Sequence, residues 1–195
     1  EELPEGEQYY LEFLGVNASA DVYVNGNHLA HHDGGYSTWR VNMTDALTDG
    51  KNLIVVAVDN NVNDRVYPQK ADFTFYGGMY RDVNIIAVNK SHFDLDYYGG
   101  NGLKVTPEVA DKNAKIDVEV FLSGEKAGQQ LVYQITDAEG VLAAETKTGI
   151  SDKQVNLEIT DVHLWNGRKD PYLYTATVCL MEDGVCIRSE ERRVG

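Results

Sequence analysis

Short segments in which apolar and polar residues alternate strictly are the feature that most constrains this chain. Residues 115–121 read Lys-Ile-Asp-Val-Glu-Val-Phe, so Ile116, Val118 and Val120 share one face and charged residues occupy the other. Successive side chains of a strand point to opposite sides, and a period of two therefore predicts half-buried β-strands. Residues 155–159 alternate in the same way, and further short strand-like runs, among them the β-branched runs 53–58 and 83–88, lie at residues 8–13, 20–24, 28–30, 53–58, 83–88, 131–135, 141–144, 172–181 and 185–187. The chain is predicted to be all-β.

Turn signals separate these segments. Asn25-Gly26 and Asp183-Gly184 each stand between two strand-like runs, and both residues of such pairs tolerate the positive φ of a type I′ hairpin turn. The segment 137–140 interrupts two further runs in the same way. One short helical turn is predicted near residues 43–47, with Asn42 or Thr44 as its cap.

The spacing of strands and turns predicts two domains. Strands every 8–12 residues are typical of β-sandwiches. Residues 90–195 have the length and strand count of an immunoglobulin-like β-sandwich. Residues 1–89 predict a jelly-roll-like sandwich, a fold of about eight strands, and too few precede the strand at 8–13. We therefore expect this first domain to be incomplete at its N-terminus.

Composition excludes several classes of function. The 195 residues carry 31 Asp and Glu against 17 Lys and Arg, and this acidic balance argues against nucleic-acid binding. No apolar run approaches the length of a membrane helix, so no membrane partner is expected. The compartment stays open between cytoplasmic and periplasmic or secreted, because a signal peptide would lie upstream.

The cysteines and histidines suggest neither a disulfide nor a metal site. A two-residue loop at Asp183-Gly184 places Cys186 opposite Met181 rather than Cys179. Free thiols are therefore favoured over a disulfide, and a metal-binding pair is favoured least. His31 and His32 are adjacent, so a strand would point them to opposite faces, and no metal ligands are expected.

One dense segment, residues 60–83, is the candidate site. It predicts a long loop rich in Asn, Asp, Arg and aromatic residues, and such loops in compact β domains are usually functional. Aromatic faces beside carboxylates and amides suit sugar binding. The alternative is structural: aromatic residues cover the end of the sandwich, and Arg81 pairs with an acid beneath them.

The same segment resembles a known family. Residues 72–83 read Asp-Phe-Thr-Phe-Tyr-Gly-Gly-Met-Tyr-Arg-Asp-Val. They are similar to the stretch that ends the N-terminal sugar-binding domain of glycoside hydrolase family 2. Residues that agree in the family's order lie at 15–29, 34–37, 164–165, 170–174 and 193–195. The chain thus resembles the sugar-binding and immunoglobulin-like domains of such an enzyme, most like a β-galactosidase.

The resemblance implies a non-catalytic fragment. In the family both catalytic carboxylates stand on a (β/α)₈ barrel, and this chain has neither that barrel nor an Asn-Glu-Pro motif. It implies no catalytic residue here and no hydrolysis by the chain alone. It implies that Asp72 binds substrate, directly or through a cation of the parent enzyme, and that a galactoside-like carbohydrate binds only with the barrel present. Phe73 and Phe75 stand where the family often has a Trp, so the resemblance does not determine the sugar specificity.

Further expectations concern the rest of the chain. Arg81 is predicted to hold the loop through a carboxylate, and Trp165 to lie in the core with its indole N–H bonded to backbone. Residues 97–100 predict a short interdomain or barrel-facing loop. Apolar patches are expected around residues 73–80, with a homo-oligomer as one consequence. The alternatives are a stand-alone carbohydrate-binding module and a pair of adhesion domains.

Overall fold

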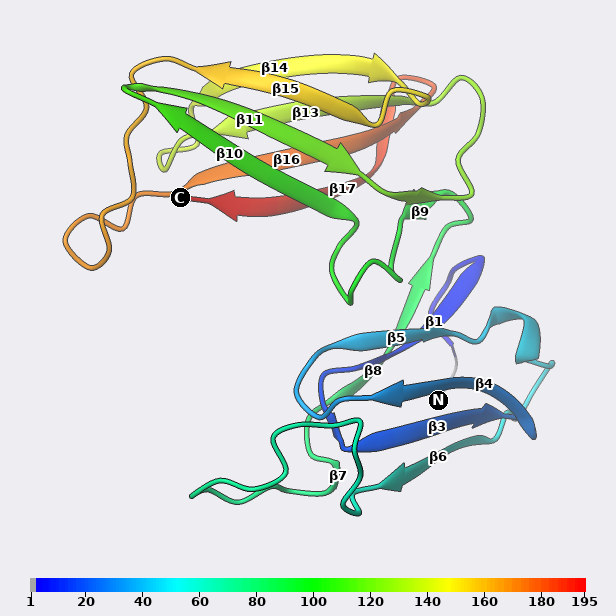
Figure 1. The fold of residues 1–195 in the computed structure, drawn as a ribbon. Helices are drawn as coiled ribbons and strands as arrows, with labels where there is room; N and C mark the ends of the chain where they lie inside the picture. The colour runs from blue at the N-terminus through cyan, green and yellow to red at the C-terminus, as the bar shows by residue number, and fades with distance from the viewer. Residues whose placement is uncertain (1–2) are drawn as a thin grey trace. The chain divides into compact units, whose positions relative to one another are not determined.

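A computed structural model describes residues 3–195 and confirms an all-β chain (Figure 1). The contacts divide it into two compact units. One comprises residues 3–90 with 98–100, and the other comprises residues 91–97 with 101–195.

The first unit is built from three small sheets. The strand orders are β5-β1-β8, β4-β3-β6 and β2-β7, with antiparallel pairing throughout. The strands are β1 (Gln8–Phe13), β2 (Val16–Asn17), β3 (Ser19–Val24), β4 (Asn27–Asp33), β5 (Trp39–Asn42), β6 (Ile54–Asp59), β7 (Gly78–Met79) and β8 (Val83–Val88). Alternate residues of β1 and β3 form the core, with Phe13 and Val22 fully buried. Phe13 stacks on Trp39 with ring centroids 4.4 Å apart.

Two local predictions for this unit are confirmed. Asn25 and Gly26 have φ values of 51° and 84° and join β3 to β4, as a type I′ turn requires. A short 3₁₀ helix, η1 (Thr44–Ala46), lies where the helical turn was predicted. Asn42 Oδ1 accepts a hydrogen bond from the Thr44 N–H at 3.0 Å, which stabilises the entry to that turn.

The second unit is a sandwich of a three-stranded and a four-stranded sheet, with a short pair beside them (Figure 1). The strand orders are β10-β11-β15, β14-β13-β16-β17 and β12-β9. The strands are β9 (His92–Phe93), β10 (Leu103–Ala110), β11 (Asn113–Val120), β12 (Leu122–Ser123), β13 (Gln130–Thr136), β14 (Leu142–Gly149), β15 (Gln154–Ile159), β16 (Tyr174–Glu182) and β17 (Val185–Val194). Ile116, Val118 and Val120 lie in the core, as their alternation predicts.

Strand β10 was not predicted. It contains Pro107, which cannot donate to a neighbouring strand and therefore argues against a central strand. The structure places β10 at the edge of its sheet, where Pro107 faces Ile116 and only one neighbour must be satisfied. An edge position makes the proline tolerable.

The prediction of free cysteines is wrong. Cys186 does pair with Met181 across the β16–β17 hairpin, as the two-residue turn requires. Cys179 lies two residues before Met181 on the same face of β16, so it is the diagonal neighbour of Cys186. A bulge between Leu180 and Met181 alters the register there, and the Cα atoms of Cys179 and Cys186 are 5.9 Å apart. That separation suits a disulfide, and the two residues form one.

Candidate functional site

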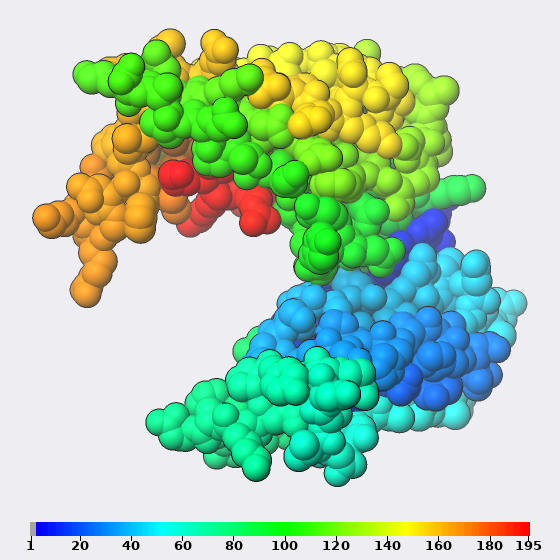
Figure 2. Space-filling view, in the orientation of Figure 1, coloured from blue at the N-terminus to red at the C-terminus, as the bar shows by residue number. Residues whose placement is uncertain are grey.

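The candidate site is the connection between β6 and β8, residues 60–82. Figure 2 shows it as a protruding part of the first unit's surface. Its last part contains β7, which pairs with β2 through Val16–Met79 and Asn17–Gly78. The segment is a long loop, as predicted, and it is closed at its end by a two-residue ladder.

The first half of the loop is braced by its own amide side chains. Asn63 Oδ1 accepts hydrogen bonds from the backbone N–H groups of Arg65 and Val66, both at 2.9 Å. Gln69 Nε2 donates to the carbonyls of Asn63 and Val66, the latter at 2.7 Å. Val66 is buried although it lies outside any strand. These bonds give the segment 63–69 a defined conformation.

Arg65 joins the loop to the β3–β4 hairpin. Its Nε donates to Asp33 Oδ2 at 2.9 Å, and its Nη2 lies 3.4 Å from Ser19 Oγ. The Ser19 hydroxyl donates to the other Asp33 oxygen at 2.5 Å. The Ser19 hydroxyl first, and then the Arg65 guanidinium, lower the pKa of Asp33 to about 2. The carboxylate is therefore ionised across the ordinary pH range.

The second half of the loop is tied to β2 and to the segment that follows β4. The buried Asn17 donates from Nδ2 to the carbonyl of Tyr76 at 2.9 Å. The Tyr80 hydroxyl donates to the carbonyl of Gly35 at 2.5 Å. A side chain at Gly35 would lie only 2.5 Å from Asn17 Oδ1, so the close packing here requires glycine.

The tip between these two anchors is exposed. Asp72 lies there on the surface, and within the described residues it has no hydrogen-bond or ion-pair partner. Phe73 and Phe75 follow it and stack on each other with ring centroids 4.7 Å apart. Phe73 is 58% exposed and Tyr76 68% exposed. The structure thus places an unpaired carboxylate next to the exposed Phe73, which stacks on the half-buried Phe75, and the role predicted for Asp72 stays a prediction.

A small cavity of about 110 Å³ lies under the loop. Four amide side chains and five apolar residues line it, with Phe75 as the aromatic member. The lining residues are Asn17, Ala18, Asn60, Asn61, Val62, Val66, Pro68, Gln69 and Phe75. Its size is that of a few water molecules rather than a sugar ring.

Two adjacent histidines on β4 have opposite surroundings, as their neighbouring positions predict. His31 faces outward, and its ring nitrogens lie 3.0 Å from Asp21 Oδ1 and 3.3 Å from Asp33 Oδ1. The hydrogen bond with Asp21 raises the pKa of His31. His32 stacks on Trp39 at 4.5 Å, and burial lowers its pKa.

Two predicted roles are wrong in their detail. Arg81 is exposed, and in the part of the chain that the structure describes it has no carboxylate partner. Its Nη1 instead donates to the carbonyls of Leu14 and Tyr36 at 3.2 and 3.1 Å. It therefore holds the end of the loop through backbone rather than through an acid.

Trp165 is not in the core. It is 55% exposed, on the connection between β15 and β16 that projects from the second unit (Figure 2). Its neighbour Leu164 is also exposed. A bridge between Asn166 and Asp170 forms a tight turn directly after it.

The residues of the segment 97–100 have different surroundings. Tyr97 stacks on Phe121 with ring centroids 4.0 Å apart, whereas Tyr98 is 91% exposed. Gly99 passes so close to the backbone of Thr38 that a side chain there would clash with it.

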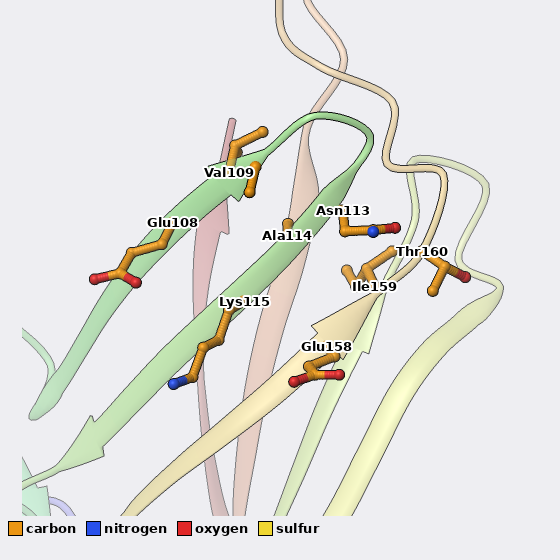
Figure 3. Close-up of a pocket in the computed structure, with 9 residues that line it drawn as sticks. Glu108, Val109, Asn113, Ala114, Lys115, Glu158, Ile159 and Thr160 are labelled. Carbon is orange, nitrogen blue, oxygen red and sulfur yellow. The ribbon is translucent and has the colours of Figure 1, made fainter.

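The second unit has a hollow of about 480 Å³ at one end of the sheet β10-β11-β15. Figure 3 shows Glu108, Lys115 and Glu158 on adjacent strands beside it. The register places Lys115 directly between the two glutamates. The lining has no aromatic ring on which a sugar could stack, so this hollow is a weaker candidate than the loop.

Among residues 3–195 no cluster of three or more His, Cys, Asp or Glu side chains is arranged to hold a metal ion. No helix in that range is long and apolar enough to cross a membrane.

The fold defines the class as modular all-β domains, and the loop of residues 60–82 adds exposed carboxylate and aromatic side chains to the first of them. The family described as glycosyl hydrolases family 2, sugar binding domain, matches residues 2–89, and glycosyl hydrolases family 2 matches residues 101–195. The chain belongs to glycoside hydrolase family 2.

Similar proteins carry two kinds of name. A "Beta-glucuronidase" of Bacteroides fragilis is 33% identical, over 97% of this chain and 29% of its own length. A "Beta-galactosidase" of Thermoanaerobacter pseudethanolicus is 27% identical, over 91% of this chain and 24% of its own length. The chain thus spans less than a third of the curated relatives it matches.

Solved structures agree in fold. An "FMN-binding beta-glucuronidase from Facaelibacterium prausnitzii L2-6" is 36% identical with a TM-score of 0.89, over 97% of this chain and 30% of its own. A "putative beta-galactosidase" from Bacteroides fragilis is 33% identical with a TM-score of 0.87, over 98% of this chain and 30% of its own length.

Proposed function

We propose that this chain is a non-catalytic part of a longer enzyme that hydrolyses terminal β-glycosidic bonds with retention. In this proposal the first unit supports the catalytic domain and lends its loop, residues 60–82, to the substrate mouth. The observation that carries it is the exposed Asp72 beside the stacked Phe73 and Phe75, on a loop fixed at both ends. Membership in family 2 supports the same role.

The chemistry of the tip fits a sugar. A carboxylate accepts hydrogen bonds from two vicinal hydroxyls, and an aromatic ring packs against the C–H face of a pyranose. Asp72 has no competing partner among the described residues, so it is available for such bonds. A hydrogen bond to a charged group contributes about 1.5–3 kcal/mol, which corresponds to about tenfold to a hundredfold in binding.

The proposed substrates are terminal β-galactosides or β-glucuronides. The relatives and solved structures carry both names: two named β-glucuronidase are 33% and 36% identical, and two named β-galactosidase are 27% and 33% identical. The proposal therefore widens the galactoside-like substrate that the sequence suggested. Specificity between the two sugars is assigned to the catalytic domain rather than to this chain.

A cation is proposed only for the whole enzyme. Asp72 belongs to no cluster of three or more His, Cys, Asp or Glu side chains in the described part of the chain, so most ligands of such a cation would come from elsewhere. The contribution of this chain to the cation site would then be the carboxylate of Asp72 alone.

The test uses the full-length enzyme and two chromogenic substrates, 4-nitrophenyl β-D-galactoside and 4-nitrophenyl β-D-glucuronide. Asp72→Ala is expected to lower kcat/KM on the preferred substrate by about tenfold or more. Asp64→Ala is the matched control, because Asp64 is an exposed aspartate of the same loop. Equal kinetics for both variants would remove Asp72 from the site.

A second measurement addresses the alternative, a stand-alone carbohydrate-binding module. Calorimetric titration of the 195-residue chain with galactose, glucuronate and lactose is expected to show no binding at millimolar sugar. Submillimolar binding by the isolated chain would favour the module.

A further inference from the structure

Arg65 and Asp33 form a contact that the loop's sequence does not suggest. The loop side of the contact is held by hydrogen bonds other than the ion pair. Asn63 Oδ1 holds the N–H groups of Arg65 and Val66, and Gln69 closes the same turn. The side chain of Val66 is buried beside it. Arg65 therefore projects from a rigid turn rather than from a flexible segment.

On the hairpin side, the carboxylate of Asp33 is also held in place. Ser19 is buried, and its hydroxyl holds Asp33 Oδ1 at 2.5 Å. His31 Nε2 lies 3.3 Å from the same oxygen. These contacts leave Oδ2 directed at Arg65 Nε, 2.9 Å away. An ion pair whose two members are both held in place loses less side-chain entropy than an ordinary surface pair.

The location of this pair affects the position of the loop tip. Residues 70–75 lie between the turn that carries Arg65 and the next anchor, the bond from Asn17 Nδ2 to the Tyr76 carbonyl. Asp72 and Phe73 are within that span, and neither is held by a hydrogen bond of its own to the rest of the unit. Their position in space is therefore set by the two ends of the span.

We propose that the Arg65–Asp33 pair, oriented by Ser19, is a positioning pair that fixes the loop tip bearing Asp72 for substrate. This rests on the proposed function of Asp72. Arg65 does not touch substrate in this proposal. It acts by keeping the carboxylate of Asp72 where a sugar hydroxyl can reach it, and a misplacement of about 1 Å is enough to lower activity strongly.

The first arm of the test does not depend on catalysis. Hydrogen exchange of the loop amides is measured by mass spectrometry in the full-length protein for Arg65→Met, Asp33→Asn and the double variant. Arg65→Met is expected to accelerate exchange in residues 66–77 about fivefold, with the strands of the second unit unchanged. The double variant is expected to exchange no faster than Asp33→Asn, because Arg65→Met and Asp33→Asn disrupt the same ion pair.

Lys70→Met is the control, since Lys70 is an exposed cation of the same loop that has no ion pair among the described residues. Arg65→Lys is expected to recover part of the protection, because it keeps the charge without the guanidinium fork. Exchange in Arg65→Met no faster than in Lys70→Met overturns the pair.

The second arm measures coupling to Asp72 in the full-length enzyme. Asp72→Ala is expected to lower kcat/KM by at least tenfold in the wild-type background and only a few-fold in the Arg65→Met background. An equal loss in both backgrounds overturns the positioning role. If exchange accelerates but Asp72→Ala changes nothing in either background, the proposed function of Asp72 fails and the positioning role falls with it, while the ion pair itself stands.

Discussion

Asn17 donates a hydrogen bond from its Nδ2 atom to the backbone carbonyl of Tyr76, at 2.9 Å and across 59 residues of sequence. The bond joins β2 to the far end of the loop that carries Asp72. The β2–β7 ladder lies beside it and reinforces the same closure. The loop is therefore long in sequence but held at its base.

Removing this bond is expected to destabilise the first unit. Asn17 is 6% exposed, so Asn17→Ala leaves a carbonyl near buried surface without its donor, at a cost of about 1–3 kcal/mol. Urea unfolding in a Trp165→Phe background reports the first unit through the buried Trp39 alone. Asn61→Ala, at an exposed loop position, is the control and should shift the midpoint little. Equal midpoints for the two variants would contradict the role given to Asn17.

How far the sequence predicts this structure depends on the range of the interaction. The strands predicted at residues 8–13 and 83–88 coincide with β1 and β8, and the Asn25-Gly26 and Asp183-Gly184 turns follow from the φ preferences of their own residues. These features are local, so neighbouring residues determine them. The strand containing Pro107 was not predicted, because its position at the edge depends on the arrangement of the whole sheet.

The candidate site divides in the same way. The composition of residues 60–83 indicates an exposed functional loop, and the structure places Asp72 at its surface. The partners of Arg65 and Tyr76 are Asp33 and Asn17, which lie 32 and 59 residues away. No pattern in the loop itself specifies such distant partners. The partners of Arg81 could not be predicted either, because they are backbone carbonyls, which every residue has.

The two histidines of β4 are expected to titrate in opposite directions. Asp21 stabilises the protonated form of His31 and raises its pKa above the ordinary value of about 6.5, whereas burial against Trp39 lowers the pKa of His32. NMR titration of the imidazole protons resolves the two midpoints. Asp21→Asn should lower the midpoint of His31 and leave that of His32 within error. Coincident midpoints for His31 and His32 would contradict the structure.

Asp33 is expected to contribute to acid stability. Its pKa is about 2 in the folded chain, below its ordinary value of about 3.9. A lowered pKa stabilises the fold above the unfolded value, and the contribution is lost as the pH falls from about 4 to about 2. Because the group is close to solvent, we expect about 1 kcal/mol. Unfolding measured at pH 6 and pH 2.5 should show a smaller loss for Asp33→Asn than for the unchanged chain, and an equal loss would refute the contribution.

The disulfide between Cys179 and Cys186 is expected to stabilise the β16–β17 hairpin modestly. The two residues are separated by 7 in sequence, and closing so short a loop in the unfolded chain contributes about 2 kcal/mol. Reductant should therefore lower the unfolding midpoint of the second unit, which Trp165 reports in a Trp39→Phe background. The Cys179→Ser and Cys186→Ser double variant should start at the lower midpoint and not respond to reductant. A thiol assay on the denatured, unreduced chain should find no free thiol, and two thiols there would show that the hairpin holds its cysteines unpaired.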